Sequence, residues 1–159
     1  MVVKNKIMKK EELLQFLLKA RMKTYAGAGG KVRPVFDGSN QLEHKEGEWF
    51  YRDLYYVGNG IFMGVEAVHF QNKPVFAMSY QGNFKGMTEE EMDKILREAL
   101  RENWQRTRIW KKVEWGKDDY KYVCEPDFVG SIEELAGIEK IYKKDKQIYI
   151  FYYAGGIIG

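Results

Sequence analysis

The chain has 159 residues and a mass of 18.7 kDa, which suits one domain and leaves little room for a second. Aromatic residues make up 15% of it and charged residues 31%, so a disordered chain and a coiled coil are both excluded. Twenty-six basic and 23 acidic residues give a net charge of +3, which is too small to indicate a polyanionic partner.

No segment predicts export, membrane insertion or disulfide bonding. The N-terminus lacks the apolar core and cleavage site of a signal peptide, and no apolar run approaches the ~20 residues that span a bilayer. Cys124 is the only cysteine, which excludes an internal disulfide and a cysteine-based zinc site. We therefore expect a cytoplasmic protein. Lys and Glu far outnumber Ser and Thr, a composition typical of proteins from hot environments.

The first predicted element is an amphipathic helix over residues 9–23, because Leu13, Phe16, Leu17 and Ala20 recur at helical spacing. The glycine-rich segment 27–30 ends this helix, and a long connection leads to an aromatic strand at 49–57. Residues 64–82 predict a β-hairpin that turns at Asn72-Lys73, since Asn tolerates the left-handed conformation of a tight turn.

A second helix is predicted to begin at Thr88, because Thr88 and Glu91 have the spacing of a capping box. Strands are predicted at 107–115 and 119–124, and a one-turn helix at 131–136. The chain closes with a second predicted hairpin, whose strands cover 138–144 and 147–153.

The two hairpins repeat one pattern at an offset of 73 residues. Matching positions include Gly64 and Gly137, Glu66 and Glu139, Val68 and Ile141, Phe76 and Tyr149, and Tyr80 and Tyr153. The sequence therefore predicts one α+β domain over residues 1–159 with an internal duplication. Its two helix-plus-three-strand repeats, about 9–84 and 88–158, share one core, with an antiparallel sheet and the helices on one face.

A loop at Asn72-Lys73 pairs residues 71 and 74. In that register Glu66 shares one sheet face with Ala77, while Met78 and Tyr80 lie on the other face. Both faces are largely apolar, so we expect one of them to line a pocket between the halves or to be covered by a second copy of the chain.

Glu66 and Glu139 are the first candidate site residues, because the duplication relates them and both have apolar neighbours on their sheet face. If both point inward, desolvation raises their pKa values and makes them acid/base or cation-binding groups. The alternative is that each pairs with a nearby Arg or Lys, since structural ion pairs also perturb carboxylates.

The strand segment 51–55 is the second candidate. Tyr51, Asp53 and Tyr55 share one face and Arg52 lies opposite, so two phenols flank a carboxylate. This pattern fits a polar site for an amine or a sugar-like ligand. An edge strand with a solvated Asp would give the same alternation.

Other motifs carry weaker signals. The glycine segment 27–30 follows a helix and lacks the spacing of a phosphate-binding loop. Residues 104–115 interleave Trp with Arg and Lys, as in single-strand nucleic-acid platforms, but a sheet-edge strand explains them better. His44, His69 and the serines fit no metal or hydrolase motif, and Cys124 is expected to be a buried structural thiol.

Several segments together resemble a known family. The most specific are Thr24-Tyr25-Ala26-Gly27 and Tyr51-Arg52-Asp53-x-Tyr55. With Phe16-Leu17-x-x-Ala20, Gly64-x-Glu66-x-Val68 and Pro74-Val75-Phe76-x-Met78-x-Tyr80-x-Gly82, they resemble an uncharacterised prokaryotic family, domain of unknown function 5680, over most of the chain.

The resemblance implies a sensing or regulatory role, because members of this family occur alone or fused behind a Cro/repressor-type helix-turn-helix. The present sequence contains no helix-turn-helix, so a direct DNA-binding role is not expected. The family supplies no catalytic residues.

We therefore predict a domain that binds a small ligand or a protein partner in an aromatic cleft between its halves. The candidate ligand-binding residues are Tyr25, Tyr51, Arg52, Asp53, Tyr55, Glu66, Tyr80, Glu139 and Tyr153. An enzyme that uses Glu66 or Asp53 as an acid or base is the first alternative, and a nucleic-acid-binding module is the second. We expect binding rather than catalysis, with no metal, cofactor, nucleic acid or membrane, and leave a homodimer open.

Overall fold

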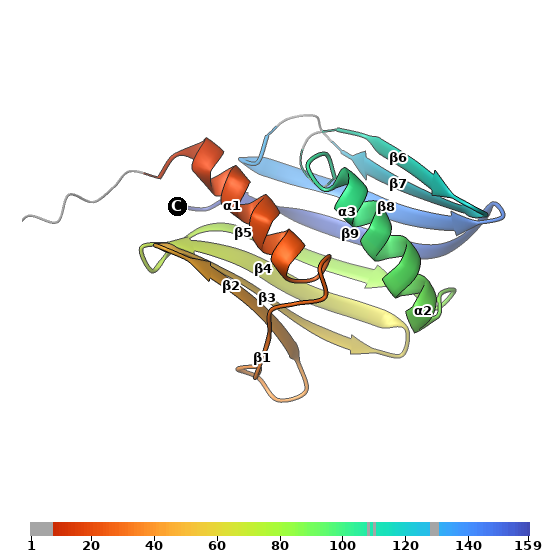
Figure 1. Cartoon of the computed structure of the whole chain (residues 1–159), viewed down its shortest axis with the longest axis horizontal. Helices are drawn as coiled ribbons and strands as arrows, with labels where there is room; N and C mark the ends of the chain where they lie inside the picture. Colours follow the sequence, from red (N-terminus) through yellow and green to blue (C-terminus); the bar gives the residue numbers. More distant parts are fainter. Residues whose placement is uncertain (1–7, 108, 110, 128–130) are drawn as a thin grey trace, which may run out of the picture.

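The computed structural model describes residues 8–107, 109, 111–127 and 131–159. These residues form one antiparallel sheet in the order β1-β2-β3-β4-β5-β9-β8-β7-β6 (Figure 1). The strands are β1 (Lys31–Val32), β2 (Asn40–Glu46), β3 (Trp49–Gly58), β4 (Ile61–Phe70), β5 (Lys73–Asn83), β6 (Val113–Lys117), β7 (Tyr120–Pro126), β8 (Glu134–Lys143) and β9 (Lys146–Ile157). Strands β5 and β9 pair from Phe76↔Ile157 to Asn83↔Ile150. This pairing joins the first five strands of the chain to the last four.

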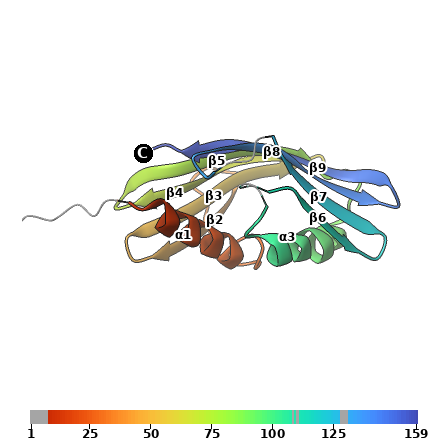
Figure 2. The same cartoon turned by 90° about the horizontal axis from the view of Figure 1, so that it is seen from above.

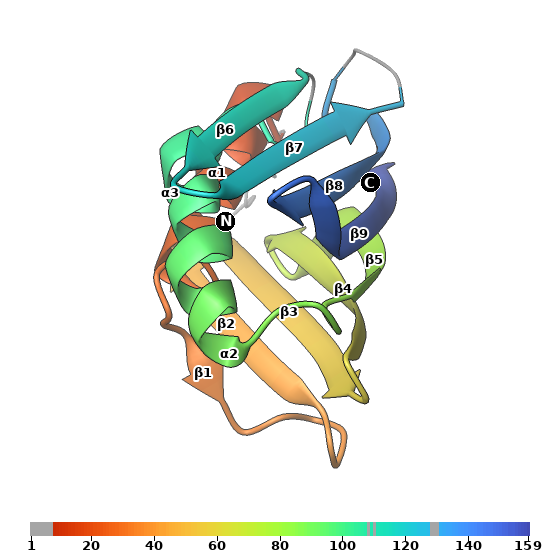
Figure 3. The same ribbon diagram turned by 90° about the vertical axis from the view of Figure 1, so that its right-hand side faces the viewer.

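Two helical segments lie on the same face of the sheet, which curves around them (Figures 2 and 3). The first is α1 (Lys10–Lys23), which confirms the predicted helix at 9–23 and contacts β2 and β3. The second consists of α2 (Glu89–Glu91), the π-helical turn η1 (Met92–Leu96) and α3 (Arg97–Asn103). Of these, α3 contacts β6. The helices therefore cover the concave face of the sheet.

The predicted fold class is wrong. Strands make up 51% of the described residues and helices 20%, so the protein is mostly one nine-stranded antiparallel sheet and not an α+β fold of two helix-plus-three-strand repeats. The connection before the aromatic strand contains β1 and β2, which the sequence analysis missed. In β2 only Leu42 is a large apolar residue, so the strand shows no apolar alternation that periodicity could detect.

The predicted one-turn helix at 131–136 is also wrong. The Ser131 hydroxyl does accept a hydrogen bond from the Glu133 N–H at 3.1 Å, as in a capped turn. The chain then enters β8, where Glu134 and Leu135 pair with Gly156 and Gly155 of β9. Pairing with a strand that follows in the sequence thus overrides the local helix signal.

The turn of the first hairpin lies one residue earlier than predicted. Gln71 and Asn72, at φ 51° and 64°, form this turn, and the register of the two strands shifts just before it, between Val68 and His69. Glu66 therefore pairs with Met78 and shares its face, so the predicted face with Ala77 is wrong. A change of register by one residue turns every side chain of the partner strand to the opposite face.

The second hairpin has the same local features. Lys144 and Asp145 form its turn at φ 48° and 64°, and a register shift lies between Ile141 and Tyr142. Each of these positions lies 73 residues after its counterpart in the first hairpin.

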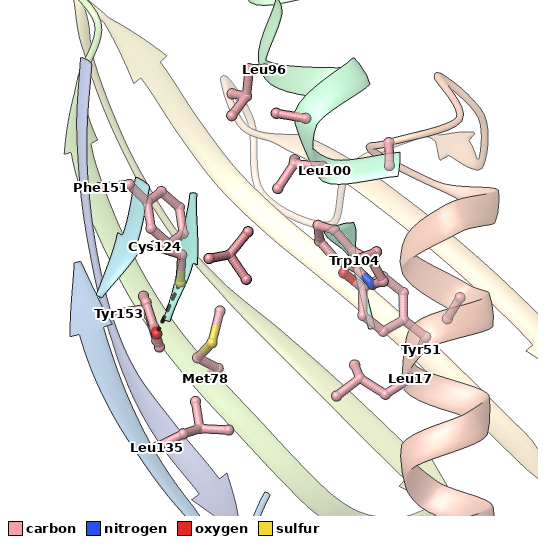
Figure 4. Packing of buried hydrophobic residues seen from close by; sticks show 14 of the residues in the cluster. Leu17, Tyr51, Met78, Leu96, Leu100, Trp104, Cys124, Leu135, Phe151 and Tyr153 are labelled. Atoms are coloured by element: carbon pink, nitrogen blue, oxygen red, sulfur yellow. Dashed lines mark hydrogen bonds between the residues drawn. The ribbon is translucent and has the colours of Figure 1, made fainter. Parts of the chain in front are cut away.

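The hydrophobic core fills the space between the helices and the concave face (Figure 4). Leu17 of α1 and Leu100 of α3 are fully buried there, as are Met78 of β5 and Cys124 of β7. The Cys124 sulfur lies 3.6 Å from the hydroxyl oxygen of Tyr153, which confirms the prediction of a buried thiol.

The convex face of the sheet exposes apolar side chains. Tyr56, Met63, Val65 and Tyr152 are 44–49% exposed and alternate with residues that face the helices. The sequence predicts that one largely apolar face of the sheet either lines a pocket or is covered by a second copy of the chain. Among the described residues, no helix is both long enough and apolar enough to cross a membrane.

The predicted capping box of the second helix is confirmed, and its glutamate also binds two neighbouring strands. The Glu91 N–H donates to the Thr88 hydroxyl at 3.1 Å, and the Thr88 N–H donates to the Glu91 carboxylate at 2.9 Å. Oε1 of the same carboxylate accepts hydrogen bonds from Lys143 at 2.5 Å and from Tyr120 at 2.6 Å. Glu91 therefore ties the start of the helix to β7 and β8.

We expect Glu91→Gln to lower the free energy of unfolding at pH 7 by about 1–2 kcal/mol. The hydrogen bonds from Lys143, Tyr120 and Thr88 lower the pKa of Glu91 to about 2 from an ordinary value of 4.5. Because the folded-state pKa is depressed, this stabilisation is present above pH 4.5 and is lost as the pH falls toward 2. Urea unfolding of both proteins at several pH values checks this.

The exposed neighbour Glu90 provides the control, and Glu90→Gln should change stability by less than about 0.5 kcal/mol. A Glu91→Gln difference that stays constant down to pH 2 would contradict the assignment.

Candidate functional site

A cavity of about 310 Å³ lies between the concave face of the sheet and the second helical segment. Strands β3, β4, β5 and β9 form its floor, and α2, η1 and α3 form much of its rim. The lining residues are Arg21, Tyr25, Tyr51, Asp53, Tyr55, Val57, Phe62, Glu66, Tyr80, Phe84, Glu89, Met92, Asp93, Arg97, Trp104, Tyr149 and Phe151. Nine of them are aromatic, so the walls are mostly rings.

The floor contains a buried ion pair. Arg21, at the end of α1, binds Glu66 through two nitrogens of its guanidinium; Nε lies 3.1 Å from Oε2, and Nη2 contacts Oε1. The Tyr51 hydroxyl donates to Glu66 Oε2 at 2.8 Å, and the Arg21 guanidinium lies 4.9 Å from the centre of the Trp104 ring. Three donors thus hold the Glu66 carboxylate in one orientation.

One donor of this network lacks a partner. Arg21 is only 1% exposed. Within the described part of the chain, its buried Nη1 has no hydrogen-bond partner. A buried donor of this kind is destabilising by about 1–3 kcal/mol unless water or a ligand accepts from it. The cavity wall therefore offers a hydrogen-bond donor.

A second carboxylate lies directly beside the first. Asp53 pairs with Glu66 across β3 and β4, and the two are 6% and 2% exposed. The Tyr80 hydroxyl donates to Asp53 Oδ1 at 2.5 Å. Two like charges opposite one another repel, and Arg21 offsets part of this repulsion. The floor of the cavity therefore holds two adjacent buried carboxylates and one guanidinium.

The phenols beside these carboxylates remain protonated. Burial and the charges of Glu66 and Asp53 raise the pKa of Tyr51 well above its usual 10, and burial and Asp53 do the same for Tyr80. Burial and the Asp53 charge also raise the pKa of Tyr55. All three hydroxyls can therefore donate hydrogen bonds at any physiological pH.

The rim contains Arg97 and Tyr25. The Arg97 guanidinium lies 4.7 Å from the centre of the Tyr25 ring, and its Nε lies 3.0 Å from Asp93 Oδ1, one helical turn earlier. The lining as a whole has four carboxylates, those of Asp53, Glu66, Glu89 and Asp93, and two guanidiniums. The formal charge of the lining is therefore −2.

The cavity brings together Tyr25, Tyr51, Asp53, Tyr55, Glu66 and Tyr80 from the set predicted by sequence. Arg52 lies on the opposite face of β3, where its Nη2 is 2.8 Å from Glu43 Oε1. Glu139 is fully buried beside Cys124 of β7, and Tyr153 contacts that cysteine. Glu66 and Glu139 therefore do not converge on this cavity.

Several wall residues were not predicted from the sequence, chiefly Arg21, Phe62, Arg97 and Trp104. Arg21 follows Leu17 by four residues on the apolar stripe of α1, so a charged residue at a buried helical position was a detectable signal. Trp104 was part of the segment 104–115 that was interpreted as a sheet-edge strand, yet it is 4% exposed and lies in the turn after α3.

The other sequence motifs lie elsewhere. Strand β6 covers only part of the predicted strand 107–115, and Arg108 and Trp110 lie outside the described residues. Trp115 donates to Glu102 at 2.5 Å. The His44 and His69 rings lie 5.9 and 5.8 Å from Phe16 and Phe50. Among the described residues, no group of three His, Cys, Asp or Glu side chains could hold a metal.

Comparison with known proteins gives one result. The model of a family described as Domain of unknown function (DUF5680) matches residues 53–158, which begin at Asp53 and include β4 to β9. No curated protein and no solved structure matches the chain.

Proposed function

Because the chain belongs to the family described as Domain of unknown function (DUF5680), whose name carries no activity, we propose a function from the cavity itself: binding of a small organic ligand that carries a positive charge. The observation that supports this most is the pair of adjacent buried carboxylates, Asp53 and Glu66, on the floor of an aromatic cavity.

The size and composition of the cavity fit a small-molecule site. Such sites occupy roughly 300–1,000 Å³, are mostly apolar, and contain a few convergent polar groups that orient the ligand. At about 310 Å³, this cavity is at the small end of that range. Its ligand is therefore compact, with about one ring and a short polar arm.

The charge of the walls favours a cation. Asp53 and Glu66 lie side by side, and Arg21 is the basic side chain that binds Glu66. A carboxylate offers about four acceptor positions, so Asp53 can accept from an ammonium group in addition to Tyr80. Charge-assisted hydrogen bonds of this kind are stronger than neutral ones.

Aromatic rings support the same conclusion. Tyr80 and Phe151 stack with ring centres 5.2 Å apart, and Phe62 stacks with Tyr149 at 5.9 Å. Ring faces attract cations by about 0.5–2 kcal/mol and also accommodate a flat apolar group. An aryl-alkyl amine combines both features.

We expect the protein to bind 2-phenylethylamine at least ~10-fold more tightly than the neutral analogue 2-phenylethanol, because only the amine forms an ion pair with the floor. Asp53→Asn preserves the shape of the side chain and should abolish most of this preference. Calorimetric titration of both compounds into the wild type and the variant measures it.

The exposed residue Asp37 supplies the matched control, since Asp37→Asn removes one negative charge from a side chain that does not line the cavity. Melting temperatures establish that each variant is folded. Equal affinity for amine and alcohol in the wild type would refute the proposal. Recovery of unchanged 2-phenylethylamine after long incubation is expected for a binding or sensing domain, whereas its conversion would favour an enzyme.

We also propose that the chain arose by internal duplication. The turns and register shifts of the two hairpins recur at an offset of 73 residues, as do Gly64 with Tyr80 and Gly137 with Tyr153. A Cβ added to either glycine would lie within 2.7 Å of the hydroxyl oxygen of its partner tyrosine, so each glycine makes room for that group. The single sheet then holds both halves as one domain.

A further inference from the structure

A second cavity, of about 220 Å³, adjoins the first. Its lining residues are Thr24, Tyr25, Ala28, Gly29, Lys31, Asn40, Leu42, Tyr55 and Arg97. Tyr25, Tyr55 and Arg97 line both cavities, so these three side chains form the boundary between them. The glycine-rich loop that follows α1 supplies the outer wall.

The two cavities have opposite charge. The charged residues of the second are Lys31 and Arg97, both basic, whereas the lining of the first has a formal charge of −2. Lys31 is exposed and lies on β1, where it pairs with Leu42 of β2. Its ammonium group can therefore reach an anion without loss of a buried interaction.

Arg97 is suited to bind an anion at this boundary. Its Nε lies 3.0 Å from Asp93 Oδ1 without hydrogen-bond geometry, and because that carboxylate is 69% exposed the pair is weak, about 0.3–0.5 kcal/mol in a helix. The ring of Tyr25 lies against the guanidinium and limits its movement. A guanidinium has five N–H donors and binds carboxylate and phosphate in a planar, two-point geometry.

We infer that the second cavity is an anion subsite, so that the ligand is bipolar: its cation lies on Asp53 and Glu66, and its carboxylate or phosphate group lies between Lys31 and Arg97. This inference rests on the proposed function and names the class of ligand. An aryl-alkyl amine with an acidic group at the far end of the ring has this chemistry.

Three probes that share one skeleton test the inference: 2-phenylethylamine, 4-(2-aminoethyl)benzoate and 4-(2-aminoethyl)phenyl phosphate. We expect at least one of the acidic probes to bind ~10-fold or more tightly than the plain amine, and the better of the two identifies the anion. The gain should decrease at high salt, because Lys31 is exposed.

Lys31→Gln should remove most of this gain and leave the affinity for 2-phenylethylamine unchanged. Lys146→Gln, at an exposed position of β9, is the matched control and should preserve the gain. Lys31 and Lys146 are both exposed, so neither change is expected to unfold the protein, which melting temperatures verify.

The outcomes separate the two proposals. Equal affinity for all three probes overturns the anion subsite and leaves the cation site standing, as does a gain that survives in Lys31→Gln. Failure of every probe to bind overturns both proposals for ligands of this size. Binding of the acidic probes that Lys31→Gln weakens supports the bipolar ligand.

Discussion

Replacement of Arg21 by methionine is expected to lower the free energy of unfolding by about 3–5 kcal/mol, as measured by urea denaturation. Arg21 is 1% exposed, and its loss leaves the Glu66 carboxylate buried at 2% exposure beside Asp53. Methionine keeps most of the volume of the side chain, so the effect comes from the charge and not from a cavity.

Two further proteins test this explanation. Arg52→Met removes the arginine of β3 that pairs with Glu43; because this side chain is 38% exposed, the change should lower stability by at most about 1 kcal/mol. Adding Glu66→Gln to Arg21→Met should restore part of the lost stability, because the orphaned charge is then gone. If the double variant is as unstable as the sum of the single changes, the ion pair is not the cause.

Gly155→Ala is expected to lower the free energy of unfolding by about 3 kcal/mol, at the upper end of what overpacking usually causes. Gly155 lies opposite Met78 at the junction of β5 and β9. A Cβ added to it would lie 2.2 Å from the Ala77 carbonyl oxygen and 2.5 Å from the Met78 Cα, and backbone atoms cannot move aside as a side chain can. Thermal and urea unfolding measure the loss.

Gly116 of β6 is the matched control for this change. The nearest atom to a Cβ at Gly116 is 3.6 Å away, an ordinary contact, so Gly116→Ala should change stability by less than about 0.5 kcal/mol. Equal effects at Gly155 and Gly116 would show that the central junction tolerates a side chain.

The sequence predicted those elements whose signal is local. The stripe formed by Leu13, Phe16, Leu17 and Ala20 suffices for α1, and the Thr88 and Glu91 spacing suffices for the helix start. The aromatic run at 49–57 likewise matches β3. In each of these the pattern needs no partner from elsewhere in the chain.

The elements that were missed depend on distant partners. Strand β2 is polar and exists because Glu43 and His44 pair with Arg52 and Tyr51. The register shift between Val68 and His69 also has no signature in the sequence, and it decides which face Glu66 occupies. The fold class was wrong because such tertiary effects add strand where local propensity gives none.

The candidate site divides in the same way. Tyr51, Asp53 and Tyr55 were found because alternation along one strand puts them on one face. Arg21, Phe62 and Trp104 reach the same cavity from a helix, a neighbouring strand and a turn, and only the packed structure shows it. Arg52 belongs to the same sequence segment, but the alternation that joins the other three places it on the opposite face of β3.

The position of β9 in the chain has a consequence for protein synthesis. Tyr149 and Phe151 of this strand complete the floor of the cavity, and β9 follows the other eight strands in chain order. While the ribosome is still translating the residues before it, the nascent chain holds Asp53 and Glu66 without the wall that encloses them. The cavity in which we propose that a ligand binds is therefore complete only after translation has passed β9.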